Sequence, residues 1–119
     1  MIYTTFRAGE KEYKLRMTAS SICELEEKIG GKNPLSLLQG ISENNLPRLS
    51  DLMMIFWGCL IPLNNKIGIK DAYTIYDEYI DGGGTLTDFI MILVDAFQVS
   101  GFLPKDETGD VKNDKRTEK

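Results

Sequence analysis

The sequence predicts an α+β fold that is predominantly α-helical, with an N-terminal β-hairpin packed on a small helical bundle. Apolar and polar side chains alternate near the N-terminus, and apolar side chains then recur at three- and four-residue steps. Ser, Thr, Asn, Gly and Pro stand where those stretches begin and end. We expect a single globular domain at residues 1–103 and a disordered polar tail at 104–119.

The predicted hairpin spans residues 2–17. Tyr13, Leu15 and Met17 alternate with charged residues, which is typical of a strand with one wet face. Gly9 supplies the turn because glycine adopts positive φ freely. An isolated hairpin is marginal in water, so we expect it to lie on an apolar surface.

The predicted helical bundle spans residues 18–101 and begins with the stretch "TASSICELEEKIGG". Ser21 and Glu24 have the spacing of a capping box, although Thr18 could begin the helix a turn earlier. Gly30 or Gly31 ends it. The expected inward stripe is Ala19, Ile22, Leu25 and Ile29.

A short second helix and a very apolar third helix are expected next. Asn33 caps the short helix, Pro34 takes its first position and Gly40 follows its end. After a polar connector anchored by Leu46, Ser50 opens the third helix together with Asp51, and Pro62 ends or kinks it. This helix has almost no polar face, so it is either central in the domain or shared with another subunit.

The fourth helix is predicted at 69–80 and the fifth begins after Thr85, which has capping spacing to Asp88. The residues expected to face inward from the fourth helix are Ala72, Tyr73, Tyr76 and Ile80. The glycine run at 82–84 lacks the lysine and the preceding strand of a phosphate-binding loop, so we interpret it as a helix end and linker. Leu86, Phe89, Ile90, Leu93, Ala96 and Phe97 form the stripe of the fifth helix, which Gly101 ends.

Composition weighs against catalysis. The chain has no histidine, the commonest general base at neutral pH and the commonest zinc ligand. Cys23 and Cys59 are far apart and lie among apolar helical positions, so we expect two buried, reduced cysteines rather than a disulfide or a reactive thiol. We therefore predict no catalytic residue, no metal site and no cofactor, and a protein that is not an enzyme.

Charge and hydropathy favour a cytoplasmic protein that binds neither nucleic acid nor membrane. The net charge is −4, whereas nucleic-acid binders usually carry a basic patch. No apolar signal-peptide region is visible at the N-terminus. The most apolar run, residues 52–63, is much shorter than the roughly 20 residues that span a bilayer.

Two candidate surfaces stand out. The third and fourth helices carry methionine and aromatic side chains suited to a partner or homo-oligomer contact, with core packing as the alternative for the tyrosines. These residues are Met53, Met54, Phe56, Trp57, Leu60, Tyr73, Tyr76 and Tyr79. On the first helix, Glu24, Glu26 and Glu27 form either a solvated face or an acidic docking face for a basic partner segment.

The order of these features resembles the tail assembly chaperones of long-tailed bacteriophages and prophages, including those of gene transfer agents. The resemblance covers roughly residues 9–103 and rests on the hydrophobic pattern around "KEYKLRMT" and "ELEEKIGG", followed by "PLSLL", "LSDLMMIFWGCL" and "YIDGGG". It implies a non-enzymatic protein of the bacterial host cytoplasm that is absent from the mature virion.

The resemblance also implies the partners, which are the tape measure protein and possibly the tail tube protein. Such chaperones keep the apolar helical stretches of the tape measure protein soluble while the tail assembles. We expect the third helix and the tyrosines of the fourth to form a groove or an oligomer seam for those stretches. The alternative is a structural phage protein, such as a head–tail connector or tail completion protein. A small regulatory or nucleic-acid-binding protein is less favoured because the chain is acidic.

Overall fold

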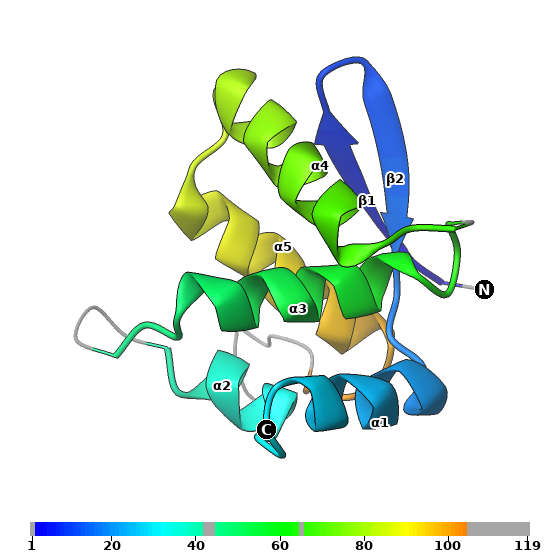
Figure 1. Ribbon diagram of the computed structural model, residues 1–119, viewed down its shortest axis with the longest axis vertical. Helices are drawn as coiled ribbons and strands as arrows, with labels where there is room; N and C mark the ends of the chain where they lie inside the picture. Colours follow the sequence, from blue (N-terminus) through cyan, green and yellow to red (C-terminus); the bar gives the residue numbers. More distant parts are fainter. Residues whose placement is uncertain (1, 42–44, 65, 105–119) are drawn as a thin grey trace, which may run out of the picture.

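The computed structural model describes residues 2–41, 45–64 and 66–104, which form a β-hairpin followed by helices (Figure 1). The predicted α+β, mostly helical fold class is confirmed. The predicted tail at 104–119 lies outside the described residues except for Pro104. The elements are β1 (Thr4–Ala8), β2 (Lys11–Leu15), α1 (Ala19–Lys28), α2 (Pro34–Gln39), α3 (Leu49–Leu60), α4 (Ile69–Asp81) and α5 (Leu86–Val99).

The hairpin pairs β1 and β2 antiparallel, with Phe6 opposite Tyr13. Gly9 in the turn has a φ of 64°, as its predicted role requires. Phe6 and Leu15 are fully buried on one face of the hairpin, while Arg7 and Glu12 form an exposed ion pair of 3.1 Å on the other. The alternation in the sequence therefore predicted both the strands and the face that is buried.

Aromatic rings join the hairpin to the helices. The Phe6 ring centroid lies 4.9 Å from that of Phe56 in α3, which in turn lies 5.0 Å from that of Phe89 in α5. Tyr76 and Tyr79 of α4 bring further rings to 4.7 Å from Phe89 and 4.8 Å from Phe6, respectively. The hairpin thus lies on a cluster to which α3, α4 and α5 all contribute.

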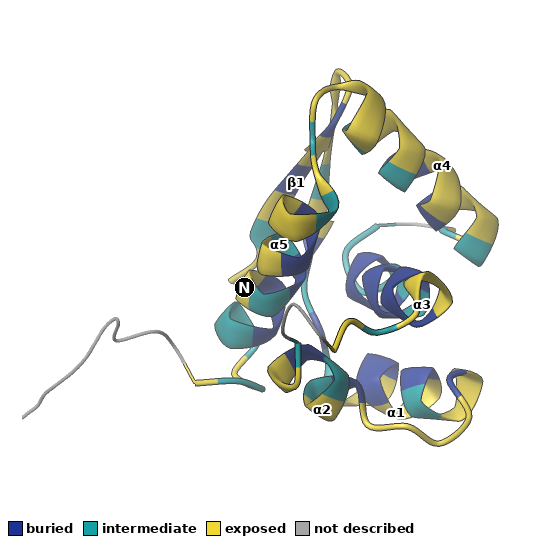
Figure 2. Cartoon of the chain, turned by 90° about the vertical axis from the view of Figure 1, so that its left-hand side faces the viewer, coloured by how far each residue is buried: buried dark blue, intermediate teal, exposed yellow. Residues whose placement is uncertain are grey.

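Helix α3 occupies the centre of the described fold, with α1 on one side and α4 on the other (Figures 1 and 2). Its C-terminal end is tied to β2, because the Arg16 amide donates to the Cys59 carbonyl at 3.0 Å and the Asn64 side chain donates to the Lys14 carbonyl at 2.7 Å. The sequence left open whether this apolar helix is central or shared with another subunit; within one chain, most of it is core.

The cap of α1 differs from the favoured prediction. Thr18 is the N-cap, its hydroxyl accepts from the Ser21 amide at 3.2 Å, and Ser21 reciprocates by accepting from the Thr18 amide at 2.8 Å. The Ser21–Glu24 capping box is therefore wrong, and the earlier start at Thr18 is correct. Ala19, expected on the inward stripe, is exposed, whereas Ser21 is buried against Met17.

Helix α3 begins earlier than predicted. Arg48 is its N-cap and makes no side-chain capping bond, so Ser50 and Asp51 lie inside the first turn instead of before it. Leu46, expected to anchor the connector, is 54% exposed. The cap of α2 by Asn33, in contrast, was predicted correctly, with its side-chain oxygen accepting from the Leu35 amide at 2.9 Å.

Helix α4 is rotated relative to the predicted inward face. Tyr73 and Ile80 were expected inside but are exposed, whereas Ile75 is buried and the ring of Tyr79 joins the aromatic cluster. The glycine run after α4 is the predicted helix end. A Cβ at Gly84 would lie 2.4 Å from the Tyr79 ring, so only glycine leaves room for that ring.

Candidate functional site

An open groove of about 320 Å³ lies between the first turns of α3 and the middle of α4. Apolar side chains dominate its lining, and two of them, Leu49 and Tyr73, are 52% and 44% exposed. We call this the α3–α4 groove. Its lining residues are Leu49, Ser50, Met53, Tyr73, Tyr76 and Asp77.

Helical spacing places these side chains on facing walls. Leu49 and Met53 are four residues apart on α3, as are Tyr73 and Asp77 on α4, so each pair lies on one face of its helix. Met53 and Tyr76 also reach the core, since Met53 is 3% exposed and the Tyr76 ring lies against Phe89. The floor of the groove therefore consists of side chains that pack in the core, whereas the side chains at its rim, Leu49 and Tyr73, are partly exposed.

Opposite charges border the two walls. Asp77 lines the α4 wall. Partial burial and, as the smaller cause, the charge of Asp77 raise the pKa of the Tyr76 hydroxyl. Next to the α3 wall, Arg48, which is not itself a lining residue, donates to the Ser50 hydroxyl at 3.4 Å. The positive end of the α3 dipole adds to the charge of Arg48. The groove thus combines an apolar floor with an acidic residue in one wall and a basic residue next to the other wall.

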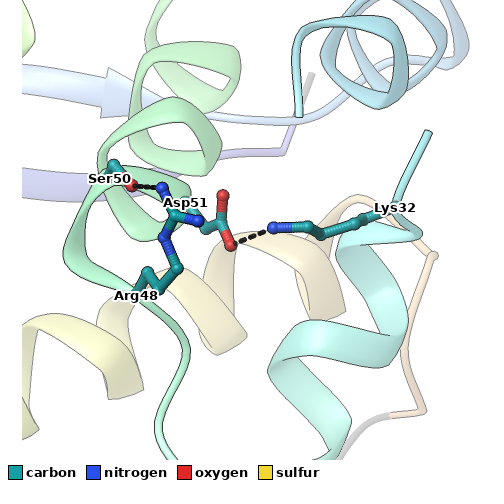
Figure 3. Close-up of polar contacts among 4 residues, drawn as sticks. All are labelled: Lys32, Arg48, Ser50 and Asp51. Atoms are coloured by element: carbon teal, nitrogen blue, oxygen red, sulfur yellow. Dashed lines mark hydrogen bonds and ion pairs between the residues drawn. The ribbon is translucent and has the colours of Figure 1, made fainter. Parts of the chain in front are cut away.

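An ion pair fixes the side of the first α3 turn that does not line the groove (Figure 3). Lys32, in the loop between α1 and α2, donates to Asp51 at 2.8 Å, and the Asp51 side chain is only 10% exposed. The Asp51 carboxylate also lies in the first turn of the helix, where the dipole favours negative charge. This pair therefore stabilises the first turn of α3 on the side that does not line the groove.

The structure brings three of the eight predicted surface residues, Met53, Tyr73 and Tyr76, to the groove. Phe56 and Leu60 are fully buried, so their predicted availability to a partner is wrong for this conformation. The remaining predicted residues, Met54, Trp57 and Tyr79, are half-buried and pack against the core away from the groove lining.

Trp57 lies on a different side of α3. Its indole nitrogen donates to the Ile67 carbonyl at 2.8 Å, and the Lys28 ammonium lies 5.5 Å from its ring centroid. These contacts use the polar tip and one face of the ring within the chain. A structural role therefore accounts for Trp57 without a partner.

The candidate acidic face lies on α1. Glu24 and Glu27 are exposed and Glu26 is half-buried. The groove lining includes none of them. The sequence therefore suggested two surfaces, and in the structure these are separate.

The cysteines differ in burial, which corrects one expectation. Cys59 is buried as predicted, and burial raises the pKa of its thiol far above the usual range. Cys23 is exposed on α1, so its predicted burial is wrong, and both thiols are free. Within the described ranges, no group of three His, Cys, Asp or Glu side chains is placed to hold a metal ion.

Volume alone would not select the α3–α4 groove. A larger hollow of about 470 Å³ lies beside the hairpin turn, but its lining has charged and small residues without a large apolar side chain. Apolar lining with a few polar groups is typical of binding sites. The chemistry of its lining therefore makes the α3–α4 groove the stronger candidate.

Sequence reasoning missed Leu49 because the helix was expected to begin after it. The spacing of Leu49 to Leu52 and Met53 is a helical signal that would have included it. Asp77 was not among the predicted surface residues. Its place at the groove depends on how α4 is rotated, which the sequence did not determine.

Comparisons with known proteins give a family but no function. No match was found among curated proteins or among solved structures. Across the described residues, each helix is too short or too polar to cross a membrane. The model of a family of unknown function, DUF6096, matches residues 2–119, and the chain belongs to this family.

Proposed function

We propose that this protein is a phage or prophage tail assembly chaperone that binds the tape measure protein and keeps it soluble during tail assembly. The observation that carries the proposal is the α3–α4 groove, where Leu49 and Tyr73 expose large apolar side chains beside Met53. Exposed apolar side chains gathered at a groove are typical of protein-binding sites. The resemblance of the helical pattern to that chaperone family supports the same function.

The groove is suited to reversible binding of apolar helical segments. Fully burying an exposed leucine or aromatic side chain contributes roughly 1.5–3 kcal/mol, and Leu49 and Tyr73 are about half exposed, so each can contribute about half of that and supply a modest affinity. Methionine adapts to varied neighbours, which suits a surface that meets several segments of a long partner. A chaperone needs such binding because its client must later leave for the tail.

Co-expression with the tape measure protein of the same gene cluster tests the proposal. We expect the tape measure protein to become more soluble and to co-purify with this chain. Leu49→Glu combined with Tyr73→Glu should abolish both effects, because two charges then enter the groove. The matched control is Met91→Glu, since Met91 is 64% exposed on α5 and does not line the groove.

Failure of the unmodified chain to solubilise or co-purify the tape measure protein would overturn the proposal. Mass spectrometry of purified particles provides a second readout. We expect this chain to be absent from them, whereas stoichiometric copies would favour the alternative of a connector or tail completion protein.

A further inference from the structure

The charged residues at the edge of the α3–α4 groove restrict which partners can bind to its apolar floor. Arg48 borders the α3 wall through its contact with Ser50, and Asp77 lies on the α4 wall. A partner that buries its apolar side chains between these walls must place its flanking residues near both charges. Charge complementarity across an interface determines which partners are accepted.

The lining also limits the backbone conformation of the partner. Both walls are made of helix side chains, and no strand residue lines the groove. A buried extended segment would leave backbone N–H and C=O groups unpaired, because the groove offers no strand edge. A helix satisfies these groups internally, and its side chains at i, i+3 and i+4 form a stripe that can enter the groove.

We propose that the α3–α4 groove takes an amphipathic helix whose apolar stripe is flanked by an acidic residue on the side facing Arg48 and a basic residue on the side facing Asp77. The inference rests on the proposed function in taking the groove as the binding surface, and it adds the charge pattern of the partner segment. A partner helix with like charges on both flanks meets repulsion on one wall.

Three synthetic helical peptides with the same apolar stripe test this pattern. One carries Lys on one flank and Glu on the other, the second carries Lys on both, and the third carries Glu on both. The unmodified protein should bind the mixed peptide about fivefold more tightly than either of the others. Fluorescence anisotropy at low salt measures the Kd values, and about 1 M salt should reduce the preference because it screens exposed charges.

Charge reversal on the protein should redirect the preference. Asp77→Lys leaves two basic sides and should favour the all-Glu peptide, whereas Arg48→Glu leaves two acidic sides and should favour the all-Lys peptide. The double variant should prefer the mixed peptide again, because the helix can bind in the opposite direction. Glu78→Lys is the matched control. Glu78 is next to Asp77 on α4 but lies outside the groove lining, and within the described residues its side chain has no hydrogen bond to a lining residue such as Arg48 has to Ser50, so the order should stay unchanged.

The proposal is overturned if none of the peptides binds, if all variants rank the peptides alike, or if Glu78→Lys changes the order as much as Asp77→Lys. Dimerisation of this chain that competes with the peptides would also overturn it, because a second copy would then occupy the groove. The two proposals can be told apart. If the tape measure protein co-purifies but the peptides show no charge preference, only the charge pattern is wrong. If the peptides show the preference but the tape measure protein does not co-purify, only the proposed function is wrong.

Discussion

The two ends of α3 both carry a leucine, Leu49 and Leu60, but these side chains differ in the structure. At the start of the helix Leu49 is 52% exposed, whereas Phe56, Cys59 and Leu60 in the later turns are fully buried. Figure 2 shows the helix nearly end-on, with its exposed first turn in front and buried turns behind it. The presence of a leucine at a helix end therefore does not show whether that side chain is core or available to a partner.

Their neighbours explain the difference. At the C-terminal end, the hairpin closes over the helix through the Arg16–Cys59 backbone bond and the Phe6–Phe56 ring contact. At the N-terminal end, the Lys32–Asp51 pair supports one side, while the side toward α4 forms the groove. One helix can thus stabilise the domain at one end and offer a binding surface at the other.

Truncation of one side chain at each end should give the largest contrast. Phe56→Ala should lower the free energy of unfolding by about 3–5 kcal/mol, because it removes a ring from the centre of the aromatic cluster. Leu49→Ala should change it by no more than about 0.5 kcal/mol, because that side chain is exposed. Urea denaturation measures both, and equal losses would show that the first turn is part of the core.

The local signals in the sequence were sufficient for the hairpin and for most helix ends. Alternation at Tyr13, Leu15 and Met17 predicted the buried face, because a strand reverses its side chains at every residue. Pro34 and Asn33 marked the start of α2, because capping depends on neighbouring residues alone. Such features need no knowledge of the rest of the fold.

Features that depend on distant neighbours could not be predicted in this way. Two stripes were possible on α4, and packing of Tyr79 against Phe6 selected the one that leaves Tyr73 exposed. Asp51 was expected to open α3, but it pairs with Lys32, which only the folded chain brings near. The groove depends on both the rotation of α4 and the pairing of Asp51 with Lys32. The sequence therefore suggested some of the groove residues but not how they are arranged.

The two basic residues that contact the first α3 turn, Lys32 and Arg48, should contribute unequally to stability. Lys32→Ala should lower the free energy of unfolding by about 1–2 kcal/mol, because it leaves the nearly buried Asp51 carboxylate unpaired. Arg48→Ala should cost no more than about 0.5 kcal/mol, because Arg48 is exposed and, within the described residues, its side chain hydrogen-bonds only to Ser50. Thermal and urea unfolding measure both changes, and the idea of a supported wall fails if the Lys32 variant is as stable as the Arg48 variant.

The smallest effect concerns alkaline pH and the buried end of α3. Burial raises the pKa of the Cys59 thiol, so the folded protein keeps this proton at pH values where the unfolded chain, with a thiol pKa of about 8.5, loses it. The contribution is fully present below about pH 8.5 and is lost as pH rises above that value. The free energy of unfolding should therefore fall by about 1 kcal/mol between pH 8 and pH 9.5.

Two cysteine variants assign this loss to the buried thiol. Cys59→Ala lowers stability at every pH, because it leaves a cavity, but it should flatten the alkaline slope. Cys23→Ser should keep the slope, because this substitution on α1 leaves the buried thiol in place. If Cys23→Ser flattens the slope instead, the buried thiol is not its source. The enclosed end of α3 would then contribute nothing to the pH dependence, and the contrast between its two ends would rest on packing alone.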